Sequence, residues 1–204
     1  MPQSLAHRRK QIRLKEYDYS QPGAYFVTMC TKDRDHYLGE IVDGRMNEND
    51  LAAIAQSCWN ELPEHYPNVQ LDEFVIMPNH VHGIIILLDD MADATSRRPN
   101  SGAGRPRPYP KPALGQIIAY FKYQSAKRIN ATRCTPGTPF WQRGYYDHII
   151  RDDKSLNRIR NYIATNPQQW WCDKENAQRK ETDRPEQWFN VDGQKAMKTT
   201  RVMI

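Results

Sequence analysis

Residues 69–88 contain two apolar runs that are separated by only two residues, Pro78 and Asn79. Both runs are short and rich in β-branched and aromatic side chains, which predicts strands over residues 69–77 and 80–88. A connection as tight as this one returns the chain antiparallel to itself, so the two strands form a hairpin. This hairpin is the strongest constraint on what the chain can fold into.

Other strands and helices are predicted on both sides of the hairpin. The predicted strands cover residues 24–30, 39–46 (with a turn at Asp43-Gly44) and 145–151, and the predicted helices cover residues 50–62, 114–129 and 153–166. Asn49 or Asp50 caps the first of these helices and Pro63 ends it, while Asp152 or Asp153 caps the last, which Pro167 ends. The order of these elements predicts an α+β fold, a ferredoxin-like antiparallel sheet flanked by helices.

The chain of 204 residues is long enough for one compact domain, which we place at residues 23–170. A basic arm over residues 1–22 precedes it, a mobile basic loop rich in Ser, Arg, Gly and Pro interrupts it at residues 89–112, and a polar tail over residues 171–204 follows it. No apolar run is long enough to span a bilayer and no secretory signal is present, so we expect a cytoplasmic protein. The four widely spaced cysteines predict reduced thiols.

Basic residues are concentrated in the middle of the chain, which carries a net charge of +5 overall. Between Ala94 and Tyr146 there is no Asp or Glu, so this stretch would present a positive field to phosphates. The predicted DNA contacts are Arg97, Arg98, Arg105, Arg107, Lys122, Lys127, Arg128 and Arg143. For the loop portion, a solvated segment without a ligand is an equally good interpretation.

His80 and His82 are the first candidate for chemistry. They are one residue apart at the start of a predicted strand, so the alternation of a strand points both imidazoles to the same face, where they can share one metal ion. Two histidines that only form hydrogen bonds in a folded core are the alternative. A histidine-triad nucleotide hydrolase is disfavoured, because Ile84 stands where that family has another histidine.

Tyr162 and Asn166 are the second candidate, since residues four apart lie on one face of a helix. Tyr162 can act as a nucleophile with Asn166 reaching the same metal, although a tyrosine beside an apolar stripe is more often a packing residue. Tyr120 is the main rival, because Gln124 follows it at the same spacing.

The string Met77-Pro78-Asn79-His80-Val81-His82 resembles the HUH signature of the single-tyrosine transposases, in which two histidines flank a bulky apolar residue. The later strings, Phe140 to Arg151 and Tyr162 to Pro167, are similar to the REP-associated branch of that family. The opening residues from Arg13 to Thr28 resemble it as well, so the likeness covers about residues 8 to 170. The flanks of Tyr120 are similar to an earlier helix of the family.

The resemblance implies that residues 23–170 form a transposase-like catalytic domain with His80 and His82 as ligands of Mg²⁺ or Mn²⁺ and Tyr162 as the attacking residue. Many single-tyrosine transposases have glutamine at the position of Asn166, and the shorter amide here would bind the metal directly or through water. Attack by tyrosine would form a 5′-phosphotyrosine and free a 3′-hydroxyl, so that the strand can later be rejoined. The resemblance also implies a hairpin-forming palindromic DNA as target, and a monomer.

The sequence therefore predicts a metal-dependent single-strand DNA endonuclease and strand transferase. Two alternatives stay open: a non-catalytic nucleic-acid-binding α+β module, and a hydrolase that uses metal-activated water in place of tyrosine. A covalent adduct with the cleaved strand distinguishes the first hypothesis from the other two.

Overall fold

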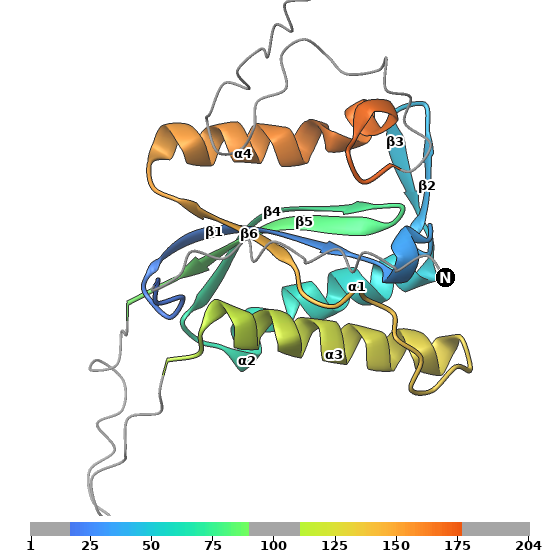
Figure 1. Cartoon of the computed structure of the whole chain (residues 1–204), viewed down its shortest axis with the longest axis horizontal. Coiled ribbons are helices and arrows are strands. Elements are labelled where there is room, and N and C mark those ends of the chain that lie inside the picture. The colour runs from blue at the N-terminus through green and yellow to red at the C-terminus, as the bar shows by residue number, and fades with distance from the viewer. Residues whose placement is uncertain (1–16, 90–110, 177–204) are drawn as a thin grey trace, which may run out of the picture.

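The computed structural model of the protein describes residues 17–89 and 111–176 (Figure 1). Its strands are β1 (Gly23–Cys30), β2 (Gly39–Val42), β3 (Arg45–Glu48), β4 (Val69–Met77), β5 (His80–Leu87) and β6 (Tyr146–Ile150). Its α-helices are α1 (Asp50–Asn60), α2 (Leu62–His65), α3 (Leu114–Thr132) and α4 (Asp153–Thr165), and its 3-10 helices are η1 (Lys32–Arg34) and η2 (Asn166–Cys172). Residues 90–110, most of the predicted basic loop, lie outside the described ranges.

The main sheet has four strands in the order β4-β5-β1-β6, and all of its neighbours pair antiparallel. Helix α1 lies in the connection from β1 to β4 and α3 in the connection from β5 to β6, and both cover one face of the sheet (Figure 1). This is the ferredoxin-like arrangement, so the predicted α+β fold is confirmed. Helix α4 is added after β6 and covers the opposite face (Figure 1).

The predicted turn at Asp43-Gly44 is present and joins β2 to β3. Both residues have positive φ angles, 50° and 72°, as a two-residue hairpin of the twisted kind requires. The hairpin forms a two-stranded sheet of its own, so residues 39–48 contribute no strand to the main sheet.

The predicted helix over residues 50–62 is shorter than expected and is followed by a second one. Asn49 caps α1 by accepting from the backbone N–H groups of Leu51 and Ala52, and the helix ends at Asn60. Pro63 does not stop the chain from turning again, because it occupies the first turn of α2. A proline costs little there, since the N–H that it lacks has no partner within a helix.

Two apolar layers lie on the two faces of the sheet. The larger layer joins α1 and α3 to the sheet through Trp59, Phe121 and Ile85, all fully buried. Gly83 is needed in this layer, because a Cβ atom there would come within 2.5 Å of the Trp59 ring. The smaller layer packs Ile159 and Ile163 of α4 against Phe26 and Ile84, and it borders the two histidines of β5.

No helix in the described part of the chain is both long and apolar enough to cross a bilayer. All four cysteines lie within the described ranges and none forms a disulfide, as predicted.

Candidate active site

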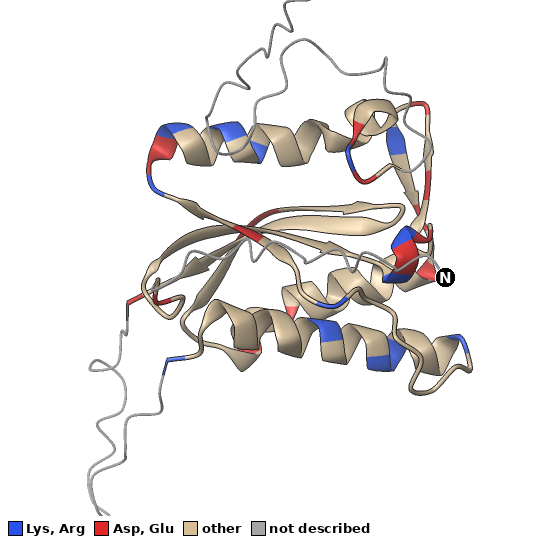
Figure 2. Ribbon diagram, in the orientation of Figure 1, with Lys and Arg blue, Asp and Glu red and all other residues tan. Residues whose placement is uncertain are grey.

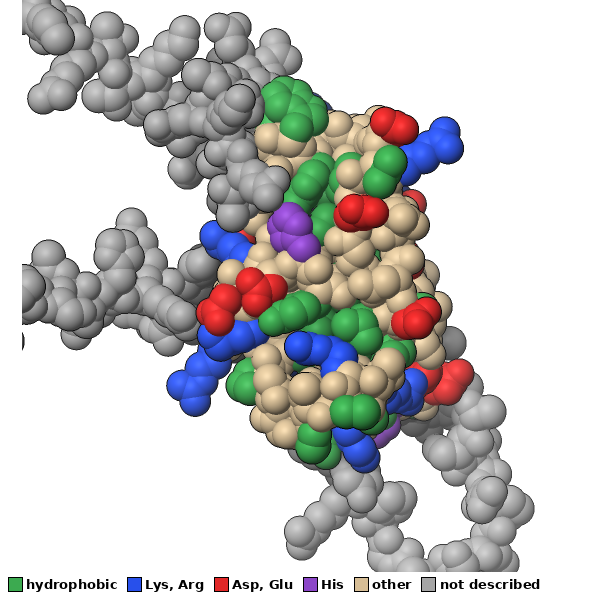
Figure 3. Space-filling view, turned by 90° about the vertical axis from the view of Figure 1, so that its right-hand side faces the viewer, with side chains coloured by type: hydrophobic (Ala, Val, Ile, Leu, Met, Phe, Trp, Pro, Cys, Tyr) green, Lys and Arg blue, Asp and Glu red, His purple; other side chains and the backbone are tan. Residues whose placement is uncertain are grey.

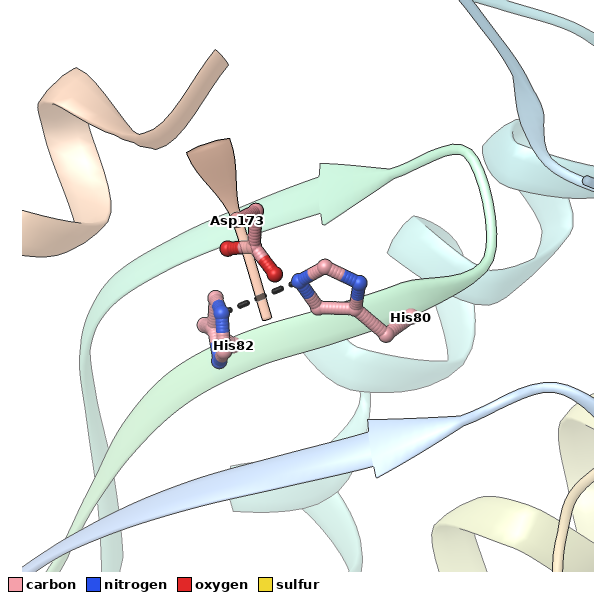
Figure 4. Close-up of side chains that lie close together, drawn as sticks. All are labelled: His80, His82 and Asp173. Atoms are coloured by element: carbon pink, nitrogen blue, oxygen red, sulfur yellow. Dashed lines mark hydrogen bonds between the residues drawn. The ribbon is translucent and has the colours of Figure 1, made fainter. Parts of the chain in front are cut away.

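His80 and His82 lie on β5 and direct their imidazoles to the face of the sheet that α4 covers. Both side chains are buried, with 0% and 1% of their surface exposed. Their Nε2 atoms are 3.0 Å apart (Figure 4). The alternation of the strand therefore brings the two imidazoles together as the sequence predicted.

The tautomer of His80 follows from its neighbour Asn79. The Nδ2 group of Asn79 donates to the carbonyl oxygens of Arg34 and Glu175, at 3.1 and 2.9 Å, so its Oδ1 atom faces the His80 ring. His80 Nδ1 lies 2.9 Å from that Oδ1, which can only accept, and Nδ1 must therefore carry the proton. In a neutral imidazole this leaves the lone pair of Nε2 facing His82.

His82 is held on its other side by Thr28 of β1. The Thr28 hydroxyl lies 2.8 Å from His82 Nδ1 and is itself buried. Because a hydroxyl can either donate or accept, Thr28 is compatible with both neutral tautomers of His82. The Phe26 ring stacks on the same imidazole at a centroid distance of 5.3 Å and limits its rotation.

Burial keeps both imidazoles neutral. It lowers the pKa of His80 to about 4, although the nearby carboxylates of Asp173 and Glu175 act in the opposite direction. Burial also lowers the pKa of His82 well below its ordinary value, and His80 adds to this effect. Neutral imidazoles are the form that binds metal ions.

The separation of the two Nε2 atoms suits a shared octahedral cation. Two ligands at about 2.1 Å from the ion, in neighbouring octahedral positions, are about 3.0 Å apart. The observed 3.0 Å matches this value, so His80 and His82 fit a divalent ion without moving apart.

Helix α4 brings Tyr162 to the histidines. Asp152 caps the helix by accepting from the Ser155 backbone N–H, and the Tyr162 hydroxyl lies 3.3 Å from His82 Nε2. Burial raises the pKa of the phenol above its ordinary value, and the Asp173 carboxylate raises it further, while the amide of Asn166 lowers it. Tyr162 is therefore protonated at neutral pH in this arrangement.

A bidentate ion pair fastens α4 to the edge of the sheet. Arg160 donates to both carboxylate oxygens of Asp72 on β4, at 2.8 and 2.5 Å. The pair lowers the pKa of Asp72. Tyr162 lies two residues further along the same helix, so this contact positions the phenol over its own sheet.

Asn166 and Asp173 complete the group around the histidines. Asn166 ends α4 and is 1% exposed; its Nδ2 atom donates to Asp173 Oδ2 at 3.3 Å. Its Oδ1 atom is also buried and has no hydrogen-bond partner among the described residues. One ligand atom each from His80, His82 and Asp173 lie within 4.8 Å of one another (Figure 4).

Asp173 was not among the predicted site residues, because it lies in the stretch over residues 171–204 that we interpreted as a polar tail. The stretch has no helical or strand periodicity and only the general signal of two acidic residues, Asp173 and Glu175, one residue apart. The structure instead folds η2 and residues 173–176 back over the histidines.

The predicted DNA contacts have different surroundings. Arg97, Arg98, Arg105 and Arg107 lie outside the described residues. Lys122 donates to the carbonyls of Gln142 and Gly144, and burial lowers its pKa to about 8. Arg128 donates to both carboxylate oxygens of Glu61 at 2.6 Å. Lys127 and Arg143 are exposed.

The described surface is not uniformly basic. Helix α3 carries basic and no acidic side chains (Figure 2). At the end of the molecule that Figure 3 faces, however, acidic side chains are interspersed with the basic ones. Of the described surface, α3 is therefore the element that best fits the predicted positive field.

The rival Tyr120 lies on α3, which covers the opposite face of the sheet from the histidines (Figure 1). Its ring stacks on that of His65 with centroids 3.9 Å apart. Tyr162, unlike Tyr120, is within hydrogen-bond distance of His82.

No family model matches the chain. Two proteins of Haemophilus influenzae are similar in sequence. One, described only as uncharacterized, is 38% identical over 165 residues, which cover 80% of this chain and 91% of the relative. The other carries the provisional name REP-associated tyrosine transposase and is 29% identical over 159 residues, which cover 74% of this chain and 73% of that protein.

Two solved structures are similar in three dimensions. A REP-associated tyrosine transposase bound to a REP hairpin has a TM-score of 0.49 and 17% identity, and the match covers 76% of this chain and 72% of that one. A protein of Deinococcus radiodurans, provisionally described as a transposase, has a TM-score of 0.43 and 15% identity over 74% of this chain and 95% of that one.

The chain combines a ferredoxin-like sheet with two strand histidines that face a helix tyrosine, the arrangement that its resemblance to single-tyrosine HUH proteins implied. The motifs around His80 and Tyr162 and the similarity to the named Haemophilus influenzae relative point to the same resemblance. The chain thus resembles the REP-associated tyrosine transposases, as its motifs indicated.

Proposed function

We propose that the protein is a metal-dependent single-strand DNA endonuclease and strand transferase that acts through a 5′-phosphotyrosine intermediate. One observation carries the proposal: the Tyr162 hydroxyl lies 3.3 Å from Nε2 of His82, whose partner His80 presents a second ring nitrogen. A phosphate bound at the histidine pair would therefore lie beside the phenol. Sequence similarity to a protein provisionally named a REP-associated tyrosine transposase supports a DNA-directed activity.

His80 and His82 would hold Mg²⁺ or Mn²⁺, and Asn166 would contribute its buried Oδ1 directly or through water. When bound, the cation would draw charge from the phosphate and orient it for in-line attack. The two imidazoles suit this role because they are neutral and already at the separation that such an ion needs.

Tyr162 would attack the phosphorus atom, forming a bond from its phenolic oxygen and breaking the bond to the 3′-oxygen. The 3′-hydroxyl would leave while the 5′-phosphate stays on the tyrosine, so the energy of the linkage is conserved for rejoining. The raised pKa of the phenol means that it stays protonated and unreactive until positive charge arrives nearby.

We propose single-stranded or hairpin-forming palindromic DNA as the substrate, on the basis of the resemblance to the REP-associated branch. The proposed phosphate contacts are Arg97, Arg98, Arg105, Arg107, Lys122, Lys127, Arg128 and Arg143. Lys127 and Arg143 are exposed, whereas Lys122 and Arg128 would have to leave their present partners to bind phosphate.

The test is covalent capture of labelled DNA. Full-length protein is incubated with Mg²⁺ or Mn²⁺ and a hairpin oligonucleotide that carries a label 3′ to the cleavage point, and the label is followed on a denaturing gel. We expect the label to stay with the wild-type protein and not with Tyr162→Phe, which lacks the attacking oxygen.

Tyr120→Phe is the matched control, because it removes the same atom from the opposite face of the sheet and should leave adduct formation unchanged. Cleavage that survives Tyr162→Phe would instead show hydrolysis by activated water. Binding of the oligonucleotide without cleavage under every metal condition would show a non-catalytic DNA-binding module.

A further inference from the structure

We infer that Asp173 supplies a third protein ligand to the cation held by His80 and His82, with Asn166 positioning its carboxylate. The inference rests on one part of the proposed function, namely that the histidine pair binds a divalent cation. It adds a ligand from a segment beyond the tyrosine helix, where neither the motifs nor the helical spacing points.

The first support is geometric. A carboxylate oxygen of Asp173 and the ring nitrogens of His80 and His82 lie within 4.8 Å of one another (Figure 4). The side chain of Asp173 projects toward the space between the two rings from the segment after η2. Donors that converge to within this distance can bind one cation after a small movement of the carboxylate, and three protein donors leave the other positions of an octahedral ion open to substrate.

The second support is that the carboxylate is held in place. Its Oδ1 atom accepts from the backbone N–H of Glu175 at 2.6 Å, and its Oδ2 atom accepts from Asn166 Nδ2 at 3.3 Å. Each oxygen of a carboxylate has a second lone pair, so both bonds can persist while the group binds a cation. Asn166 thus also acts on the cation site through Asp173, while its own Oδ1 stays available to the cation, directly or through water.

The third support is the charge balance. Asp173 is 1% exposed, and no Lys or Arg in the described ranges forms an ion pair with it. Glu175 offers the contrast: it is also buried, but Arg34 pairs with its carboxylate at 2.7 Å. A buried carboxylate beside two neutral imidazoles is unfavourable unless a cation offsets its charge. The donor set of two imidazoles and one carboxylate suits a divalent ion.

The test measures the binding of Mn²⁺ alone to the full-length protein without DNA, by titration calorimetry and by loss of the EPR signal of the free ion. We expect Asp173→Asn and Asp173→Ala to weaken Mn²⁺ binding by at least about tenfold. Glu175→Gln is the matched control, because it neutralises a buried carboxylate in the same segment, and it should stay within about twofold of wild type.

Thermal unfolding of the metal-free variants separates a ligand from a structural residue. Removal of an uncompensated buried charge should leave the Tm of Asp173→Asn unchanged or higher, while the rise in Tm that Mn²⁺ causes in the wild type should be reduced. Wild-type Mn²⁺ affinity in both Asp173 variants would overturn the inference, and so would an equal loss in Glu175→Gln.

These outcomes are distinct from failure of the proposed function. If the wild type binds Mn²⁺ through Asp173 but forms no covalent adduct, the ligand assignment stands and the transferase proposal fails. If the adduct forms and only His80→Ala and His82→Ala weaken Mn²⁺ binding, the transferase proposal stands and Asp173 is not a ligand.

Discussion

At the scale of single residues, the histidine pair is deeply buried and uncharged. Asn79 forces the proton of His80 onto Nδ1, and the enclosure of both rings lowers their pKa values, to about 4 for His80. The same burial raises the pKa of Tyr162. The three groups are thus all uncharged at neutral pH, so none of them adds a charge to the closed site.

The lowered pKa of His80 predicts a pH-dependent stability of the metal-free protein. Between the unfolded pKa of about 6.5 and the folded pKa of about 4, the unfolded chain binds a proton that the folded chain does not. The free energy of unfolding should therefore fall as the pH drops through this window, by up to about 1.4 kcal/mol per pH unit for each such histidine.

Urea unfolding at a series of pH values in the presence of a chelator measures this slope. His80→Gln removes one of the two titrating groups, so its slope between pH 4 and 6 should be shallower than that of the wild type. Equal slopes in the two proteins would show that His80 does not have a lowered pKa in the folded state.

At the scale of elements, the position of the proposed nucleophile, Tyr162, depends on how α4 is attached. Its apolar side contacts the sheet through Ile159 and Ile163, and the Arg160 fork on Asp72 fixes the helix along its axis. Apolar contacts alone would allow α4 to slide along the sheet, because they have little directional preference. The bidentate pair supplies the direction that sets Tyr162 opposite His82.

We predict that Arg160→Gln reduces adduct formation severalfold while lowering the free energy of unfolding by only about 1 kcal/mol. Arg160→Lys keeps the charge but loses the planar guanidinium. Compared with Arg160→Gln, it should restore more of the free energy of unfolding than of the rate of adduct formation. The measurements are urea unfolding and the single-turnover rate of adduct formation at saturating DNA. A rate that falls only in proportion to the folded fraction would contradict a positioning role.

The elements themselves were largely predictable from the sequence, because hairpin turns, caps and hydrophobic periodicity are local signals. The strands of the main sheet and the helix of Tyr162 were predicted close to their observed bounds, and Asn49 was one of the two predicted caps of α1. The fold of residues 166–176, which return across the candidate site, was not predicted. Its contacts join Glu175 to Asn79 and Cys30, which lie 96 and 145 residues away along the chain, and no local pattern encodes such pairs.

At the scale of the whole molecule, one chain contains both halves of the candidate site. Helix α4 docks on the sheet of its own chain, so Tyr162 faces His82 without help from a second copy. In an enzyme that exchanges its tyrosine helices, the two groups would come from different chains. The arrangement therefore predicts that a monomer is sufficient for adduct formation.

A mixture of two inactive variants tests this prediction. His82→Ala retains the nucleophile and Tyr162→Phe retains the histidine pair, so a helix-exchanged dimer of the two would rebuild one complete site. We expect no adduct in the mixture, and a rate for the wild type that is proportional to its concentration, with light scattering reporting the mass of one chain. Activity in the mixture would instead show exchange of α4.

The Thr28 hydroxyl affects how the proposed site would bind a cation. Without an ion, His82 donates from Nε2 to His80 and accepts from Thr28; with an ion, Nε2 must be bare and Nδ1 must donate to the same hydroxyl. The imidazole changes tautomer while a single O–H bond swivels, and every heavy atom keeps its place. Above the pH at which the rings protonate, binding of the cation should thus release no proton to the buffer. Titration calorimetry in buffers of different ionisation enthalpy should then give the same heat of binding.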